Sequence, residues 1–193
     1  MDHLQGIDVG LNAGTPYHEI ARKIYLTYPT KAFAECEEQQ YEIFNEISTY
    51  FDISITCIQV AGSAKTGRSF HKKQDFVPGT SDLDIAIIDT RLFAKYAEIV
   101  YRGCKGGADL TKFPLRNGAS TSRDYFQYLA RGIFRPDLMT VGHERAAWNS
   151  FFSQLSQKHT KLFGSISAAI YLSQTFFEGK QRSAIKNYAD KGI

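Results

Sequence analysis

The sequence predicts an α/β or α+β fold, with a short, twisted mixed sheet flanked by helices and a helical layer at the C-terminal end. Two apolar, β-branched runs, ISITCIQVA from residue 53 and IAIID from residue 85, are typical of strands. Segments on either side of them carry apolar residues at helical spacing. The order of helices, strand, loop, strand, helix, strand and helices indicates one small domain.

The composition is that of a globular domain. Of the 193 residues, 43% are hydrophobic and 13% aromatic, which excludes disorder along the whole chain. Lys and Arg outnumber Asp and Glu by 23 to 20 and are scattered, so the charge suits a polyanionic ligand and leaves a nucleic-acid partner open. The three cysteines lack a CxxC pair and are typical of reduced thiols. Without a signal-peptide pattern or a run of about 18 apolar residues, we expect a cytoplasmic protein with no membrane association.

The segments before the first strand are expected to form an arm and two helices. Residues 1–14 are Gly-rich and irregular and predict a flexible arm. Thr15-Pro16 is typical of a helix start, because the hydroxyl can cap the helix and proline fits its first position. A longer helix is expected over about residues 30–50, with Phe33 and Phe44 on its apolar side.

The segments after the first strand alternate loops with regular elements. A polar stretch that contains Pro78-Gly79 predicts a loop before the second strand, and a helix after that strand ends at Gly103. A Gly-rich loop, a short helix capped by Ser122 and a weak strand at RPDLMTV follow. The expected parts of this single domain are the flexible arm, an α/β core with N-terminal helices, and a C-terminal helical layer, at residues 1–14, 15–142 and 143–193.

Two carboxylates stand at the start of the second strand, in TSDLDIAIID. Side chains alternate along a strand, so Asp82 and Asp84 are expected to point the same way. Neighbouring carboxylates repel each other unless a cation lies between them. Mg²⁺ fits this pair, because it takes one or two carboxylates and completes its coordination with phosphate and water. Taken alone, however, an Asp-x-Asp pair is more often an ordinary polar strand end.

The end of the first strand gives the acidic pair a context. A buried strand that runs into Gly62-Ser63 can turn sharply and present backbone N–H groups and a hydroxyl to phosphate oxygens. Glycine matters at this turn because a Cβ would hold a phosphate away. With two carboxylates on the next strand, the turn predicts a site for a triphosphate and its metal.

Strand, Gly-Ser, loop and Ser-Asp-x-Asp at a hydrophobic strand together resemble the nucleotidyltransferase superfamily related to DNA polymerase β. The resemblance implies that family's fold and its reaction, in which an acidic pair binds two metal ions and NMP passes from an NTP to an acceptor. The metal is expected to be Mg²⁺, with Mn²⁺ as an alternative. The residues that the resemblance assigns to nucleotide or metal are Gly62, Ser63, Ser81, Asp82 and Asp84.

Two features depart from the family pattern. The gap between Ser63 and Asp82 is longer than usual, so SFHKKQDFVPGT is interpreted as an insertion. The family also uses a third carboxylate from a later strand, which completes the second metal site and can deprotonate the acceptor hydroxyl. The candidate for this role is Asp137 in FRPDLMTV, although a turn aspartate after Pro136 is equally consistent with the sequence. Asp109 is the second choice.

Four basic residues near the Gly-Ser turn are candidates for neutralising pyrophosphate: Lys65, Arg68, Lys72 and Lys73. Each of them alone is more often a solvated loop residue. Two magnesium ions about 3.5–4 Å apart would stabilise the attacking and leaving oxygens of an in-line displacement at the α-phosphate. ATP is the default donor because it is abundant. The acceptor stays open between a protein side chain, a small molecule, an RNA 3′ end and a second nucleotide, and family analogy suggests a helical partner protein.

Two alternative functions compete with this prediction. GSAKTGRS approaches the P-loop pattern, with Asp89 as the second acid, but Arg68 replaces the lysine and Pro78 interrupts the helix that must follow a P-loop. A P-loop-like NTPase is therefore less favoured. The other alternative is a module of the same fold that binds nucleotide without transferring it, because its third carboxylate is not intact. The position of Asp137 separates this alternative from an enzyme.

Overall fold

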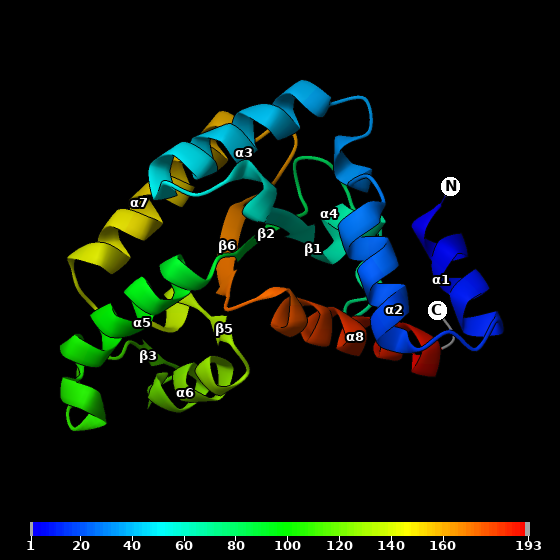
Figure 1. Ribbon diagram of the computed structural model, residues 1–193. Coiled ribbons are helices and arrows are strands. Elements are labelled where there is room, and N and C mark those ends of the chain that lie inside the picture. The colour runs from blue at the N-terminus through cyan, green and yellow to red at the C-terminus, as the bar shows by residue number, and fades with distance from the viewer. Residues whose placement is uncertain (1, 192–193) are drawn as a thin grey trace.

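A computed structural model describes residues 2–191 of the chain and places six strands there. These strands are β1 (Ile58–Ala61), β2 (Leu83–Ile88), β3 (Leu115–Arg116), β4 (Ala119–Ser120), β5 (Ile133–Phe134) and β6 (Ile166–Tyr171). Four of them form a mixed sheet in the order β1-β2-β6-β5, and β3 and β4 form a separate hairpin (Figure 1). β2 runs antiparallel to β1 and parallel to β6. The predicted mixed α/β class with a short mixed sheet is confirmed.

Helices cover both faces of this sheet (Figure 1). The α-helices are α1 (His3–Asn12), α2 (Tyr17–Arg22), α3 (Glu37–Phe51), α4 (Gly62–Thr66), α5 (Thr90–Gly103), α6 (Ser122–Ala130), α7 (His143–Lys158) and α8 (Gln174–Lys191). The shorter helical turns are η1 (Lys23–Thr27), η2 (Lys31–Phe33), η3 (Ile55–Cys57), η4 (Lys105–Gly107) and η5 (Pro136–Leu138). α3, α5 and α7 share one apolar cluster with the sheet, and α2 and α8 share a second one on its other face.

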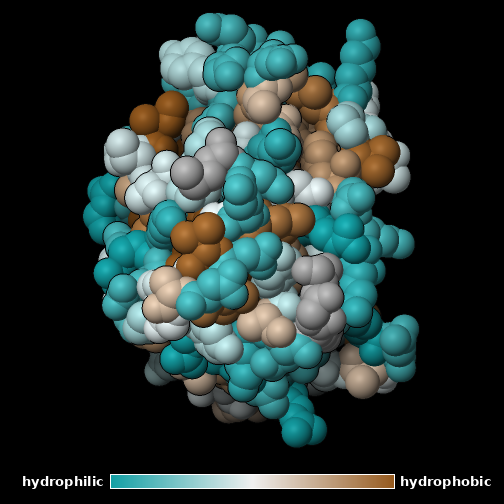
Figure 2. All heavy atoms as spheres, turned by 90° about the vertical axis from the view of Figure 1, so that its right-hand side faces the viewer, coloured by the Kyte–Doolittle hydropathy of each residue, from teal (hydrophilic) through white to brown (hydrophobic). Residues whose placement is uncertain are grey.

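The surface carries few obvious clues to a partner. Figure 2 views the molecule from the right-hand side of Figure 1 and shows small apolar groups between hydrophilic residues on that side. Within residues 2–191, no helix combines the length and the apolar character needed to span a membrane.

The two faces of the sheet differ in chemistry because side chains alternate along β2. Leu83 and Ile85 are buried in the core beneath α3, α5 and α7. Asp84 points to the opposite face, where its neighbours in the sheet register are Ala61 on β1 and Ser167 on β6. The start of β2 thus places an exposed carboxylate on the face of the sheet against which α2 and α8 pack.

Helix α1 corrects the expectation of a flexible arm over residues 1–14. Its glycines allow close packing against α2 and the segment that follows it. A Cβ at Gly6 would lie 2.8 Å from Tyr28 Oη, and one at Gly10 would lie 2.8 Å from Ile20 Cγ1. Ile7 between them is fully buried. The glycine content that indicated flexibility is therefore a packing feature, which becomes visible only when the partner residues are known.

Strand β6 corrects the expectation that residues 143–193 form only a helical layer. β6 lies between β2 and β5 and pairs with both. Its centre, Ser-Ala-Ala, has no strand preference, so local sequence did not reveal it. Burial of Ile166 and Ile170 in the core fixes it as a strand. The strand expected at RPDLMTV is also corrected, because Pro136–Leu138 form the turn η5 directly after the short strand β5.

Phe134 gives a prediction about stability. Its side chain is fully buried, and its ring centroid lies 5.6 Å from that of Tyr96 and 5.8 Å from that of Tyr125. Phe134→Ala is expected to lower the free energy of unfolding by about 3–5 kcal/mol, as measured by urea denaturation. Phe126→Ala is the matched control, because Phe126 is 40% exposed. A loss below about 1 kcal/mol for Phe134→Ala would contradict the packing described.

Candidate functional site

Gly62 and Asp84 meet where β1 ends and β2 begins. Gly62 has a φ angle of 65°, in the left-handed region that favours glycine. A Cβ at Gly62 would also collide with Oδ2 of Asp84. Any side chain at this position would therefore strain the backbone and displace the carboxylate. The structure thus brings together two residues that the sequence singled out, and it gives a physical reason for glycine there.

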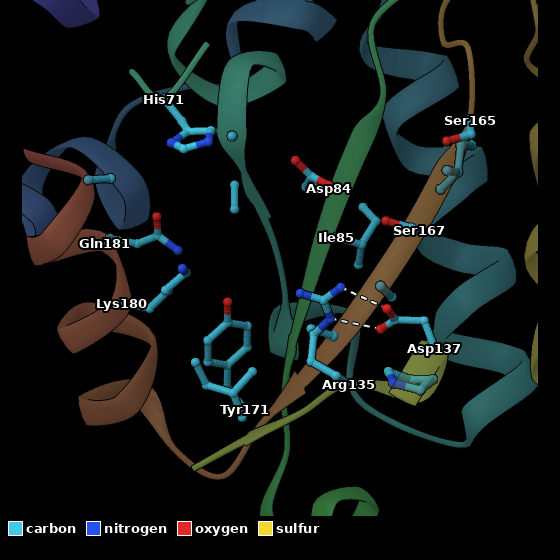
Figure 3. Close-up of a pocket in the computed structure, with 18 of the residues that line it drawn as sticks. His71, Asp84, Ile85, Arg135, Asp137, Ser165, Ser167, Tyr171, Lys180 and Gln181 are labelled. Carbon is cyan, nitrogen blue, oxygen red and sulfur yellow. Dashed lines mark hydrogen bonds and ion pairs between the residues drawn. The ribbon is translucent and has the colours of Figure 1, made fainter. Parts of the chain in front are cut away.

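A cleft of about 860 Å³ opens beside Asp84. Sheet strands β2, β5 and β6, the loop after α4, and helices α7 and α8 all contribute to its walls. Figure 3 shows His71, Asp84, Arg135, Lys180 and Gln181 around a common space. Its charged lining residues, together with histidine, are Arg68, His71, Asp84, Arg135, Asp137 and Lys180. The predicted site residues that line the cleft are Gly62, Arg68, Asp84 and Asp137, whereas Ser63, Lys65, Ser81 and Asp82 do not.

The carboxyl group of Asp84 has a raised pKa. The largest cause is that surrounding protein atoms remove water from this carboxyl group. The negative charge of Asp82 raises the pKa further. Arg135 and Lys72 act in the opposite direction, as does a hydrogen bond from Ser167. The ionised form of Asp84 is therefore less stable in the folded chain than in water. A bound cation would reverse this, because it favours the charged carboxylate.

Asp82 and Ser81 lie just outside the cleft. Asp82 precedes β2, and its Oδ1 accepts a hydrogen bond of 2.7 Å from Ser165 Oγ. Ser81 Oγ accepts a hydrogen bond of 3.0 Å from the backbone N–H of Val77, which closes the turn before β2. Ser81 therefore has a structural function in the loop. Asp82 is exposed, and its negative charge contributes to the raised pKa of Asp84.

Helix α4 separates the predicted phosphate-binding residues from one another. Ser63 is partly buried, and its carbonyl oxygen accepts a hydrogen bond of 2.8 Å from the backbone N–H of Gly67, which ends the helix. Lys65 is only 3% exposed, and its Nζ donates a hydrogen bond of 2.6 Å to the carbonyl oxygen of Tyr28. The Lys65 side chain thus fastens α4 to the segment after α2. It points away from the place that the sequence predicted for it.

The loop after α4 is held by an ion pair within the loop and by packing against α8. Arg68 pairs with Asp75 through Nη1 and Oδ1 at 2.8 Å, and this contact holds the loop closed on itself. Phe70 is buried against Tyr188 of α8, with ring centroids 5.0 Å apart. His71, next to Phe70, lines the cleft. The segment interpreted as an insertion therefore forms one wall of the cavity.

Asp137 is held by two arginines. Its carboxylate accepts hydrogen bonds of 2.8 and 2.9 Å from Nε and Nη2 of Arg135, and Arg116 Nη2 lies 3.1 Å from its Oδ2. Burial opposes ionisation of this carboxyl, but the two arginines outweigh it and lower the pKa of Asp137. Asp137 therefore lines the cleft as a paired carboxylate, not as a free one.

The described part of the chain contains no group of three or more His, Cys, Asp or Glu side chains placed to hold a metal ion. Asp82, Asp84 and Asp137 accordingly do not form a three-carboxylate cluster. Asp109, the second choice, accepts hydrogen bonds from Thr111 in a surface turn and is absent from the cleft lining. The residue beside Asp84 on β6, where an acid would be nearest, is Ser167.

Sequence reasoning missed several cleft residues. Arg135 lies two residues before Asp137, and its charge between the buried Phe134 and Pro136 was the available signal. Lys180 and Gln181 come from α8, far along the chain from Asp84, and they face the cavity (Figure 3). No local pattern connects these two residues to the acidic pair. Only the folding of α8 across the sheet places them there.

The structure does not support the P-loop alternative. Helix α4 has five residues and ends at Gly67, so no long helix follows the Gly-rich segment. Asp89 Oδ1 accepts a hydrogen bond of 2.7 Å from the backbone N–H of Leu92 and caps α5. Its position at a helix start explains Asp89 without a metal.

Comparisons with protein-family models, curated proteins and solved structures find no match to this chain.

The burial of Lys65 predicts a pH dependence of stability. Loss of solvation lowers the pKa of Lys65 to about 8. The protonated side chain is therefore unfavourable in the folded state below about pH 8, and this penalty decreases as the pH rises toward the unfolded value of 10.5. Relative to Lys65→Met, the natural chain is expected to gain about 2 kcal/mol in unfolding free energy from about pH 7 to about pH 9.5.

Urea denaturation of both chains across that pH range measures the difference. Groups that titrate in both chains cancel in the comparison. Lys180→Met is the control, because it removes an ammonium group from an exposed position. A difference between the natural chain and Lys65→Met that stays constant with pH would contradict the assigned burial.

Proposed function

We propose that this chain is a metal-dependent nucleotidyltransferase, which binds a nucleoside triphosphate in the cleft and moves its nucleotidyl group to an acceptor. The single observation that carries the proposal is the contact between Gly62 and Asp84 at the mouth of the cleft. It places a strand end without a side chain directly beside a carboxylate. This is what close approach of a phosphate chain and its metal requires. The resemblance of Gly-Ser and Ser-Asp-x-Asp to the superfamily related to DNA polymerase β agrees with it.

Asp82 and Asp84 are the residues that would hold Mg²⁺. They fit this ion because Asp82 destabilises the charge on Asp84, and a divalent cation between them would relieve that repulsion. Two carboxylates also satisfy magnesium when phosphate and water complete its coordination. When bound, the ion supplies neutralisation of phosphate charge and polarisation of the phosphorus centre.

The other cleft residues bind and orient the nucleotide. Gly62 leaves room for the Asp84 carboxylate beside the backbone, and Arg68 and His71 on the loop bring hydrogen-bonding groups to the same space. Lys180 and Gln181 reach in from α8 on the opposite wall (Figure 3). The rings of Phe70, Tyr128 and Tyr171 line the same cleft and offer a surface for a base. ATP is proposed as the donor on abundance alone.

A second candidate function is nucleotide binding without transfer. The pairing of Asp137 with Arg135 and Arg116 favours it, because this carboxylate cannot accept a proton readily while two arginines bind it. Ser167, rather than an acid, stands beside Asp84 on β6. A protein of this kind would bind the nucleotide without transferring it, and its function would depend on whether nucleotide is bound.

Label transfer tests the proposal. The purified chain is incubated with α-³²P-labelled nucleoside triphosphates, Mg²⁺ and a cell extract, and the products are separated by size. We expect label on an acceptor, and we expect the double variant Asp82→Ala/Asp84→Ala to reduce it at least about 100-fold. Asp109→Ala changes an acid outside the cleft and is the control, with transfer unchanged.

Three outcomes decide between the candidates. Transfer that disappears only in the double variant supports the enzyme. If the double variant transfers label as well as the natural chain does, the assignment of the site to Asp82 and Asp84 is wrong. Nucleotide binding that needs both aspartates, without transfer to any component of the extract, supports the binding module and contradicts the enzyme.

A further inference from the structure

Arg135 is the cleft residue whose surroundings are most fully determined. Asp137 binds it through two parallel hydrogen bonds, to Nε and Nη2. The ring of Tyr128 lies under it, with 5.1 Å between the guanidinium carbon and the ring centroid. A long flexible side chain is thus fixed from two directions. Such fixation is typical of an arginine that has to meet a ligand in one orientation.

Part of the guanidinium remains available to a ligand. Arginine has five N–H donors, and the two hydrogen bonds to Asp137 engage Nε and one donor of Nη2. Among the described residues, Nη1 has no hydrogen-bond partner. Figure 3 shows the guanidinium extending into the cavity toward Asp84, with Lys180 on the far side of the same space. The free edge therefore faces the cavity.

The strand order separates this free edge from the Gly-Ser turn. Gly62 follows β1, and Arg135 follows β5, while Asp84 lies on β2 between them in the order β1-β2-β6-β5. Neighbouring strands are about 4.8 Å apart, so β5 lies roughly 10 Å from β2. A triphosphate on the Gly62 side and an anion at Arg135 would thus flank Asp84 from opposite sides. A nucleotidyltransferase needs this arrangement for donor and acceptor.

The cleft has room for a second ligand beside a nucleotide. Polar side chains from α7 and β6, namely Asn149, Ser153 and Ser167, are part of its lining. The volume of about 860 Å³ is near the upper end of the roughly 300–1,000 Å³ that small-molecule sites occupy, which leaves room beside a nucleotide.

We propose that Arg135, oriented by Asp137 and Tyr128, binds a phosphate group on the acceptor, so that the acceptor is a phosphorylated molecule. This inference rests on the proposed nucleotidyl transfer. In it Asp137 is a positioning residue that acts through Arg135. A phosphate matches the free guanidinium edge, because its oxygens can accept two N–H groups at once.

The test uses inorganic phosphate as the probe and protein saturated with Mg²⁺ and α,β-methylene ATP, which cannot transfer its nucleotidyl group. Phosphate is titrated while ¹H–¹⁵N spectra record the backbone and the arginine Nε–H signals. We expect saturable binding that Arg135→Ala weakens at least about 10-fold, the worth of one charge-assisted hydrogen bond. Asp137→Asn is expected to weaken phosphate binding as well while leaving the affinity for the ATP analogue unchanged.

Arg116→Ala is the matched control. Arg116 also pairs with Asp137, but it does not line the cleft, so its removal is expected to leave phosphate binding within about 2-fold. Arg135→Lys keeps the charge without the planar fork, and it replaces Arg135→Ala if that variant fails to fold. Acetate is titrated in parallel, and acetate binding as tight as phosphate binding would contradict the phosphate assignment.

The remaining outcomes separate this proposal from the proposed function. If phosphate competes with the ATP analogue, or if Arg135→Ala weakens the analogue instead, Arg135 serves the donor and the acceptor assignment is overturned. If the natural chain does not bind the analogue at all, the proposed function fails. Titration of the nucleotide-free protein then still shows whether an anion site depends on Arg135.

Discussion

Gly62→Ala is expected to abolish Mg²⁺-dependent nucleotide binding while lowering the unfolding free energy by about 1–2 kcal/mol. The stability loss comes from forcing a residue with a Cβ into the left-handed conformation that Gly62 adopts. The loss of binding has a separate cause, because the new Cβ collides with Oδ2 of Asp84 and displaces the carboxylate. Calorimetric titration with a non-hydrolysable ATP analogue measures the loss of nucleotide binding, and urea denaturation measures the loss of stability.

Gly118→Ala is the control that measures the cost of the left-handed backbone conformation alone. Gly118 also has a positive φ, of 79°, but no atom lies within 4 Å of the position its Cβ would take. Its replacement is expected to cost a similar 1–2 kcal/mol, roughly, and to leave nucleotide binding unchanged. If Gly62→Ala bound nucleotide as tightly as the natural chain, the close approach of Gly62 and Asp84 would have no functional meaning.

Asp84→Asn is expected to remove ligand-induced stabilisation while making the metal-free protein more stable at neutral pH. The raised pKa of Asp84 means that its ionised form is unfavourable in the folded state. This penalty is fully present above the folded pKa, and it vanishes as the pH falls below the unfolded value of 3.8. The stability advantage of the variant should therefore shrink as the solution is acidified.

Addition of Mg²⁺ and nucleotide reverses the ranking. At 100 times the dissociation constant, the natural chain should gain about 2.7 kcal/mol in unfolding free energy, and Asp84→Asn should gain almost none. Denaturation in EDTA and in Mg²⁺ with the ATP analogue, each at two pH values, gives four unfolding free energies for each chain. Asp124→Asn, on the exposed side of α6, is the control and should follow the natural chain. Equal gains for the natural chain and Asp84→Asn would exclude Asp84 from the ligand site.

The sequence was informative where chemistry and local pattern coincide. The strand periodicity around Leu83 and Ile85 placed Asp84 on one face, and the apolar run before Gly62 ended at that residue, where the short helix α4 begins. Both features depend on neighbours within a few residues. The meeting of Gly62 with Asp84 then followed from two adjacent antiparallel strands, which is the simplest arrangement for sequential strands.

Long-range packing limited the prediction elsewhere. β6 is a strand because its isoleucines fill the core between the sheet and α7, and nothing in Ser-Ala-Ala indicates this. The N-terminal glycines face Ile20 and Tyr28, which the local sequence does not connect to them. Asp137, predicted as a third metal-binding carboxylate, lines the cleft. Its arginine partners were not foreseen, because Arg116 comes from a hairpin with no strong strand signal.

Binding of Mn²⁺, followed by the loss of its free-ion electron paramagnetic resonance signal, tests the central claim most directly. Mn²⁺ uses the same oxygen ligands as Mg²⁺, and the signal that is lost to the nucleotide analogue alone is measured without protein and subtracted. The natural chain is predicted to bind the ion in the presence of α,β-methylene ATP, at least about 100-fold more tightly than Asp84→Asn does, because even indirect partners of metal ligands are worth 10–100-fold. Identical Mn²⁺ binding by the natural chain and Asp84→Asn would contradict a metal–nucleotide site at Asp82 and Asp84.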